Sequence, residues 1–330
     1  MDCIEMRVAV LGLGAMGGLF AALLVRSGVS VSALARGETL QRLLSRGLIL
    51  EMNSQQTTHA IPASHDPLVL GKHDLVIVAV KAPALPALAH SIEALRAPGG
   101  VVLSAMNGVP WWFFQGFGGV CEGMRLQTVD PGGMLAATIP PGAVLGSVLH
   151  MSASTPAPAH VLHATGLRVI LGEPSGEMSG RLARIAACFQ QAGFAVETSP
   201  RIHDDIWFKL WGNMTMNPIS ALTGATIDRM LDDPQVSRFC LAVMREAREI
   251  GERFGCRIAQ QAEERNAVTR KLGAFRTSML QDVEAGRPVE LDALLGVVKE
   301  IAQALGCAVP AIDALLGLTR LRMQTLGLYP

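Results

Sequence analysis

Near its start the chain places an apolar strand, a glycine-rich turn and an apolar helix in direct succession. The segment RVAVLGLGAMGGL, from Arg7 to Leu19, contains the pattern G-x-G-x-x-G. In this context the first glycine permits a tight turn, the second lets the backbone approach a pyrophosphate, and the third lets the helix pack closely on the strand. The phosphates then meet the helix N-terminus, whose free N–H groups favour negative charge. The predicted cofactor-binding loop is Gly12, Leu13, Gly14, Ala15, Met16 and Gly17.

The second predicted strand ends in a basic residue. VSVSALA, from Val29 to Ala35, alternates as a strand does, and Arg36 follows it. A site specific for NAD carries an acidic residue here, which binds the ribose hydroxyls, whereas an arginine can meet the 2′-phosphate of NADP. The sequence therefore predicts NADPH as the cofactor. A solvated Arg36 in a turn is the alternative that the sequence leaves open.

Polar residues also follow the next two apolar strands. LVIVAV, from Leu75 to Val80, is followed by Lys81, and GVVLSAM, from Gly100 to Met106, is followed by Asn107. Ligands of an open parallel sheet bind off the carboxyl ends of its strands. We therefore expect Lys81 and Asn107 to face the nicotinamide or its substrate. A solvated lysine and a turn-forming Asn-Gly pair are the alternatives.

The length of 330 residues suits two domains. From 124 to 172 short strands alternate with Pro and Gly, as in an antiparallel extension of a sheet, and beyond residue 200 the pattern is helical throughout. We therefore expect a Rossmann-type α/β domain at 1–199 and an all-α domain at 200–330, joined by a hinge at Ser199-Pro200. The helices expected late in the chain are Asp233–Phe254, Gln260–Glu284, Leu291–Leu305 and Ala311–Met323.

Composition excludes several classes of protein. Lys+Arg and Asp+Glu number 28 each, so the basic surface of a nucleic-acid-binding protein is not expected. The six cysteines are scattered, without C-x-x-C or metal-ligand spacing, which favours reduced thiols in the cytoplasm and no metal site. The uncharged run from Val8 to Val25 is rich in glycine and begins as a buried strand, so no membrane span is expected. The first five residues are interpreted as a short disordered lead.

The stretch DDIWFKLWGNMTMN, which begins at Asp204, carries the residues for which we predict chemistry. In a helix, Lys209, Asn213 and Asn217 stand at i, i+4 and i+8, where side chains share one face with a drift of roughly 40° per step. One ammonium and two carboxamides can therefore line a binding site while the apolar residues bury the helix. We expect Pro218 to end or kink the helix. An exposed surface lysine is the alternative interpretation.

Two polar residues stand out further along the chain. Ser278 places a hydroxyl near the expected end of a helix, and Glu290 opens the next helix after a Gly-Arg-Pro break. A negative charge at a helix start is favoured by the helix dipole, so helix capping is the simpler interpretation of Glu290.

Taken together, these motifs resemble the ketopantoate reductase (2-dehydropantoate 2-reductase) family over essentially the whole chain. The matching segments are GLGAMG at Gly12, Val80-Lys81-Ala82, Asn107-Gly108, Lys209-x3-Asn213-x3-Asn217-Pro218, Ser278–Asp282 and Glu290-Leu291-Asp292. The resemblance implies a Rossmann-type domain followed by a helical domain like the C-terminal domain of 6-phosphogluconate dehydrogenase. It also implies NADPH-dependent reduction of a small branched 2-oxo acid, most directly 2-dehydropantoate to pantoate in pantothenate and coenzyme A biosynthesis.

The resemblance further implies roles for individual residues. Lys209 is the proton donor, and Glu290 is a catalytic and substrate-binding carboxylate. Ser278 binds the substrate carboxylate. The carboxamides that orient the substrate are Asn213 and Asn217, and the residues on the nicotinamide side are Asn107 and Lys81.

The sequence departs from the family pattern at several positions. Met106 replaces a glutamine, Ile227 replaces a substrate-binding asparagine, and Trp111 and Trp112 lie in an insertion. These departures put the identity of the oxo acid in doubt.

A 3-hydroxyisobutyrate or 6-phosphogluconate dehydrogenase type is disfavoured, because such enzymes place Gly-x-Gly just before the lysine, and a non-catalytic NADP-binding sensor is a further alternative. The mean hydropathy of +0.34 suggests a homodimer interface.

Overall fold

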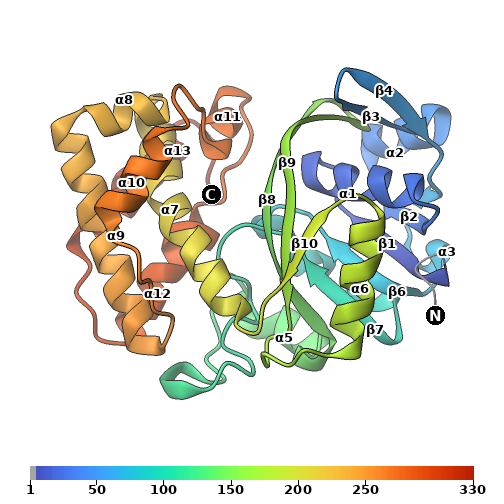
Figure 1. The fold of residues 1–330 in the computed structure, drawn as a ribbon, viewed down its shortest axis with the longest axis horizontal. Coiled ribbons are helices and arrows are strands. Elements are labelled where there is room, and N and C mark those ends of the chain that lie inside the picture. The colour runs from blue at the N-terminus through green and yellow to red at the C-terminus, as the bar shows by residue number, and fades with distance from the viewer. Residues whose placement is uncertain (1–4) are drawn as a thin grey trace. The chain divides into compact units, whose positions relative to one another are not determined.

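The computed structural model describes residues 5–330 and divides them into two compact units (Figure 1). The first comprises the described residues up to Met106 together with Gly133–Asp205, and the second comprises Asn107–Gly132 together with Ile206–Pro330. The single boundary expected at 199/200 therefore does not describe this division, because the segment that begins at Asn107 belongs with the helices. Apart from Glu5, the expected disordered lead lies outside the described residues.

The first unit is built on one ten-stranded sheet with the order β4-β3-β9-β8-β7-β6-β1-β2-β5, and β10 pairs with β9. The strands are β1 (Arg7–Leu11), β2 (Ser30–Leu34), β3 (Leu48–Met52), β4 (Gln55–His59), β5 (Ala63–Ser64), β6 (His73–Val78), β7 (Arg96–Ser104), β8 (Val144–Ala157), β9 (His160–Gly172) and β10 (Ala195–Thr198). From β5 to β8 the neighbours are parallel, whereas β8–β9 and β3–β4 are antiparallel. The short strands expected from 124 to 172 are in fact one long hairpin, β8–β9.

Helices cover both faces of this sheet. They are α1 (Ala15–Arg26), α2 (Gly37–Arg46), α3 (Pro67–Leu70), α4 (Ala89–Leu95), α5 (Met134–Thr138) and α6 (Gly180–Gln191). The helices α1 and α6 share one face, where the ring of Phe20 lies 5.3 Å from that of Phe189 and 4.9 Å from that of Phe194 (Figure 1). β1 is apolar and buried beyond its first residue, as strands covered on both faces are. Within residues 5–330, none of the helices has the length and apolar character needed to cross a bilayer.

The second unit is helical. Its elements are α7 (Ile202–Thr223, in this unit from Ile206), α8 (Ile227–Asp232), α9 (Pro234–Phe254), α10 (Ala262–Arg270), α11 (Ser278–Glu284), a π-helical turn η7 (Asp292–Gly296), α12 (Val297–Ala304) and α13 (Pro310–Thr325). The single helix expected over Gln260–Glu284 is wrong. Gly273 adopts φ +66°, a conformation outside the α region, and Thr277 caps a new helix by accepting a hydrogen bond from the N–H of Leu280.

Pro218 does not end α7, because the helix runs on to Thr223. A proline inside a helix costs about 3 kcal/mol through its missing N–H and its ring. Tertiary packing offsets that cost here. Met214 and Thr215 are fully buried, and the indole N–H of Trp211 donates to the carbonyl of Met244 on α9 at 2.7 Å.

The segment Asn107–Gly132 is tied to the helices by aromatic and polar contacts. Four consecutive aromatic residues, from Trp111 to Phe114, are buried, and the ring of Phe114 lies 5.2 Å from that of Phe254 on α9. The carboxylate of Glu300 on α12 accepts the backbone N–H groups of Gln127 at 2.7 Å and Thr128 at 2.9 Å. These contacts make the segment an integral part of the helical unit.

Candidate active site

The three glycines of the first turn occupy different environments. Gly12 adopts φ +86°, and a Cβ added there would lie 2.7 Å from the carbonyl oxygen of Ala79. A Cβ at Gly17 would lie only 1.9 Å from the carbonyl oxygen of Gly12. Within the described residues no atom comes within 4 Å of a Cβ built on Gly14, which precedes α1 in an extended conformation. The space above Gly14 and the uncharged first turn of α1 suit an anionic group at the helix N-terminus.

Arg36 and Lys81 follow strands that neighbour β1. The register pairs Leu11 with Leu34 of β2 and with Val78 of β6, so the residues after all three strands meet at one edge of the sheet. Arg36 precedes α2 and is exposed, and among residues 5–330 its guanidinium has no hydrogen-bond or ion-pair partner. Lys81 is partly buried at the start of a short 3-10 turn. Both residues lie at the edge where the glycine loop leaves the sheet.

In the second unit, residues far apart in the sequence meet on α7. The ammonium Nζ of Lys209 donates a hydrogen bond to Oδ1 of Asn107 at 2.8 Å. One and two turns further along the helix, Asn213 is partly buried and Asn217 is buried. The amide Nδ2 of Asn217 lies 3.5 Å from Oγ of Ser278, at the long limit of a hydrogen bond. The predicted polar stripe therefore exists, with Asn107 at one end and Ser278 at the other.

The surroundings of Lys209 lower the pKa of its ammonium and so favour the uncharged amine. Burial lowers the pKa of its ammonium from the ordinary value of 10.5 to about 8, and the nearby carboxylate of Glu290 opposes that shift. Burial disfavours the charged form, and an opposite charge favours it. A group with a pKa near 8 is still mostly protonated at neutral pH and gives up its proton far more readily than a solvated lysine. Such a group is well matched to general acid catalysis.

The backbone that carries Asn107 docks on the π-helical turn η7. Gly108 adopts φ +87°, and a Cβ there would lie 2.3 Å from the carbonyl oxygen of Ala293. The N–H of Val109 donates to the same oxygen at 3.0 Å. Because η7 begins two residues after Glu290, this contact joins the segments that carry Asn107 and Glu290. Sequence reasoning missed η7, and the Asn107-Gly108 pair was the one signal of a close backbone contact.

The structure also shows the local setting of Ser278, Glu290 and Ile227. Ser278 is exposed and begins α11 rather than ending a helix. Glu290 immediately precedes the helical residues that start at Leu291. Ile227, which stands where the family pattern has an asparagine, is buried, and its N–H donates to the carbonyl of Phe275 at 3.1 Å. The side chain of Ile227 is therefore part of the core rather than a polar ligand.

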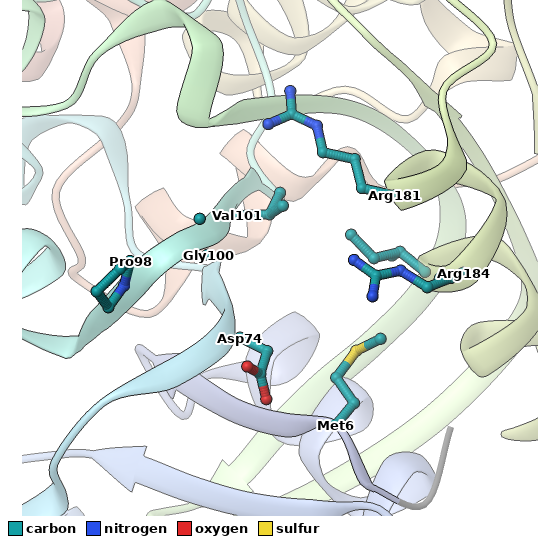
Figure 2. Close-up of a pocket in the computed structure, with 9 residues that line it drawn as sticks. Met6, Asp74, Pro98, Gly100, Val101, Arg181 and Arg184 are labelled. Carbon is teal, nitrogen blue, oxygen red and sulfur yellow. The ribbon is translucent and has the colours of Figure 1, made fainter. Parts of the chain in front are cut away.

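A pocket of about 170 Å³ lies elsewhere in the first unit (Figure 2). Met6 and Asp74 line it at the amino ends of β1 and β6, and Arg181 and Arg184 reach it from α6. Arg181 is already held by the carboxylate of Glu173 at 2.7 Å. Ligands of such sheets bind at the opposite, carboxyl edge, so this pocket is not the predicted cofactor site. The described chain holds no cluster of three or more His, Cys, Asp or Glu residues that could hold a metal ion.

A glycine loop on a parallel sheet and a partly buried lysine on a helical unit are features of a dinucleotide-binding oxidoreductase of two units. Comparison with known proteins narrows the class. The family model described as Ketopantoate reductase PanE/ApbA matches residues 8–111, and the model described as Ketopantoate reductase PanE/ApbA C terminal matches residues 201–323. The chain belongs to the ketopantoate reductase family, as its motifs predict.

Individual relatives span the whole chain. A 2-dehydropantoate 2-reductase from Mesorhizobium japonicum is 38% identical over 325 residues, which are 98% of this chain and 100% of the relative. A Ralstonia solanacearum protein assigned to the ketopantoate reductases has a crystal structure with 54% identity and a TM-score of 0.95, covering 98% of this chain and 99% of that one. A PanE/ApbA family ketopantoate reductase from Ralstonia eutropha has 26% identity and a TM-score of 0.84, covering 98% and 100%. The predicted fold class is confirmed.

Proposed function

We propose that this protein reduces 2-dehydropantoate to pantoate, with NADPH as the hydride donor. The observation that carries the proposal is Lys209, an ammonium with a pKa of about 8 that is bonded to Asn107 and acted on by the charge of Glu290. Membership of the ketopantoate reductase family supports the substrate. Because the chain belongs to this family, the alternative of a 3-hydroxyisobutyrate type of dehydrogenase is no longer supported.

The glycine loop and Arg36 fit the cofactor. The open space at Gly14 and the start of α1 can receive a pyrophosphate, which the N–H groups of the loop would bind. The exposed guanidinium of Arg36 suits the 2′-phosphate, because an arginine binds a phosphate with two parallel hydrogen bonds. Lys81 is assigned to the nicotinamide side. When bound, the dinucleotide supplies the hydride that reduces the carbonyl carbon.

Lys209 supplies the proton. Its ammonium donates to the carbonyl oxygen of the substrate, which becomes the hydroxyl of the product, and its positive charge stabilises the alkoxide that forms. A positioned acid of this kind contributes typically about 10²–10⁴-fold to the rate. The bond to Asn107 holds the ammonium in place before substrate arrives. Burial favours the transfer, because it lowers the pKa of the donor.

The remaining polar residues are assigned to the substrate. Asn213 has no hydrogen-bond partner among residues 5–330 and can orient the oxo acid, together with Asn217. Ser278 is assigned to the substrate carboxylate, and its exposed hydroxyl lies 3.5 Å from Asn217. Glu290 is assigned to the distal hydroxyl, which would donate a hydrogen bond to the carboxylate. These assignments give ketopantoate a contact that a simpler branched oxo acid lacks.

A substrate panel tests the proposal. We expect steady oxidation of NADPH, followed by its absorbance, with ketopantoate giving the highest kcat/KM among small 2-oxo acids that include 2-oxoisovalerate. NADPH binding without turnover on any member of the panel would instead identify a cofactor-binding sensor. A clear preference for an oxo acid without the distal hydroxyl would overturn the assignment of ketopantoate while keeping the reaction type.

We further propose that the enzyme acts in the cytoplasm, in the supply of pantothenate for coenzyme A, and that it forms a homodimer. The scattered thiols support a reducing compartment, and the high mean hydropathy of +0.34 supports a buried interface. Cell fractionation tests the compartment. Light scattering on the purified protein tests the dimer, and a mass of one chain at micromolar concentration would contradict it.

A further inference from the structure

The last residues of the chain lie against the segment that carries Glu290. The phenol Oη of Tyr329 donates a hydrogen bond to Oδ1 of Asp292 at 2.8 Å. One residue earlier, the carbonyl of Leu328 accepts the N–H of Val289 at 3.1 Å. Glu290 therefore stands between two residues, Val289 and Asp292, that the C-terminal tail holds.

Asp292 is the first residue of the π-helical turn η7. The same turn presents the carbonyl of Ala293, which accepts the N–H of Val109 two residues after Asn107. Gly296 closes the turn, and a Cβ added there would lie 2.9 Å from Oδ1 of Asp292, so the carboxylate lies tightly against the turn. π-helical turns are uncommon and occur frequently at functional sites. A single turn of chain thus contacts the tail on one side and the segment of Asn107 on the other.

We propose that Tyr329 is a positioning residue, which fixes η7 through Asp292 and thereby sets the placement of Glu290 and Asn107 around Lys209. The inference rests on the proposed function, since it deepens the role of Glu290 in that site. Tyr329 is the single tyrosine of the chain and is partly buried. Its phenol touches neither substrate nor cofactor in this scheme and acts only through the turn that it holds.

The Tyr329–Asp292 bond persists over the working pH range. Burial, and next the bond to Asp292, raise the pKa of Tyr329 to about 12, while the positive charge of Arg320 opposes the shift. The phenol therefore remains a protonated donor at any pH at which the enzyme is assayed. The charge of Glu290 raises the pKa of Lys209, against the effect of burial. A displaced Glu290 should therefore be detectable as a lowered pKa of Lys209.

The test compares Tyr329→Phe with wild type in the full chain, using kcat/KM for ketopantoate as a function of pH. We expect the alkaline limb of the profile to move to lower pH by about half a unit, so that activity above the limb falls about threefold more than activity at neutral pH. Glu290→Gln in the same assay sets the largest shift available. Thr325→Val is the matched control, because it deletes a C-terminal hydroxyl whose hydrogen bond, to Leu321, stays within α13.

Amide hydrogen exchange supplies a readout that does not depend on turnover. We expect the N–H of Val109, bonded to Ala293 of η7, to exchange faster in Tyr329→Phe and to be unchanged in Thr325→Val. Unchanged exchange in Tyr329→Phe overturns the proposal, whether or not the protein reduces ketopantoate. If the N–H of Val109 exchanges faster in Tyr329→Phe but the alkaline limb of kcat/KM stays in place, Tyr329 does not position Glu290. If Glu290→Gln also leaves the limb in place, Glu290 does not set the pKa of Lys209 and the proposal fails, whereas its contact with the distal hydroxyl is tested separately.

Discussion

The glycine loop, Gly12 to Gly17, and the Lys209 site are built in opposite ways. The loop consists of six consecutive residues, and its shape follows from close contacts within the loop and with Ala79. The Lys209 site draws on four separate stretches, at Asn107, on α7, at Ser278 and at Glu290. A local site depends on the size of single residues, whereas a dispersed site depends on the packing that brings its parts together. Substitutions should therefore affect the two regions through different measured quantities.

The largest effect is expected at Lys209. Lys209→Ala should lower kcat about 10²–10⁴-fold through loss of the general acid, and it should leave NADPH affinity unchanged, because the glycine loop lies in the other unit. Steady-state kinetics and NADPH titration measure the two quantities. The exposed Lys271 is the matched control, since Lys271→Ala removes a lysine of the same unit. A loss below about threefold at Lys209, far under that general-acid range, would make it a structural lysine.

Gly17→Ala should affect the other region. The added Cβ would lie 1.9 Å from the carbonyl oxygen of Gly12, so the loop must move and its hydrogen bonds to phosphate are lost. We expect NADPH affinity to fall about a hundredfold, which is the loss of one or two charge-assisted bonds. Fluorescence titration measures it. Gly180→Ala makes the same substitution where no described atom lies within 4 Å of the new Cβ, and it should bind NADPH like wild type.

Arg36→Ala should affect the affinities for NADPH and NADH differently. Loss of a charge-assisted contact with the 2′-phosphate should weaken the binding of NADPH about ten- to a hundredfold and leave the binding of NADH nearly unchanged. Dissociation constants for both cofactors decide the matter. Arg46→Ala, at the far end of the same helix α2, serves as the control. Equal losses for NADPH and NADH would mean that Arg36 only supports the turn before α2.

Glu290→Gln tests whether the Lys209 site contacts the distal hydroxyl of the substrate. If the carboxylate accepts a hydrogen bond from the distal hydroxyl, kcat/KM for ketopantoate should fall about tenfold, whereas 2-oxoisovalerate, which lacks that hydroxyl, should be little affected. The four kcat/KM values form a cycle that isolates the coupling between mutation and hydroxyl. Zero coupling, together with a small loss of stability, would instead support the helix-dipole interpretation of Glu290.

The last expected effect, absent near neutral pH, is on pH dependence. The folded pKa of Lys209, about 8, lies below its ordinary value of 10.5, so the proton donor is present below pH 8 and is lost as pH rises through that value. We expect kcat/KM for ketopantoate to be level near neutrality, halved at about pH 8 and about tenfold lower one unit above. A profile that stays level to pH 10 would show that the ammonium is solvated or is not the acid.

The same contrast explains what the sequence could predict. Buried strands, the glycine turn and the amphipathic α9 are local patterns, and the expected Rossmann-type and helical parts are confirmed. The stripe Lys209, Asn213 and Asn217 was also predictable, because three residues at helical spacing need only one helix. The roles of these residues stay predictions.

Features that depend on distant contacts were not predictable. The helix continues through Pro218 because α9 packs against it, and no local rule contains that packing. The segment after Asn107 belongs to the helical unit because Glu300, far along the chain, binds the backbone of Gln127 and Thr128. The turn η7 has no sequence signature, so the link between Asn107 and Glu290 became visible only in three dimensions.

The insertion of Asn107–Gly132 into the helical unit has a consequence for synthesis on the ribosome. Its buried aromatic residues, Trp111 to Phe114, emerge well before Phe254 and the other helical residues that cover them. At about 5–20 residues per second, they wait roughly 7 to 30 s for Phe254. During that interval β8 must join β7 across an unburied aromatic loop, which is the kind of surface that chaperones bind and that promotes aggregation. A nascent chain released before α9 is complete lacks Phe254, and with it part of the cover of those aromatic side chains.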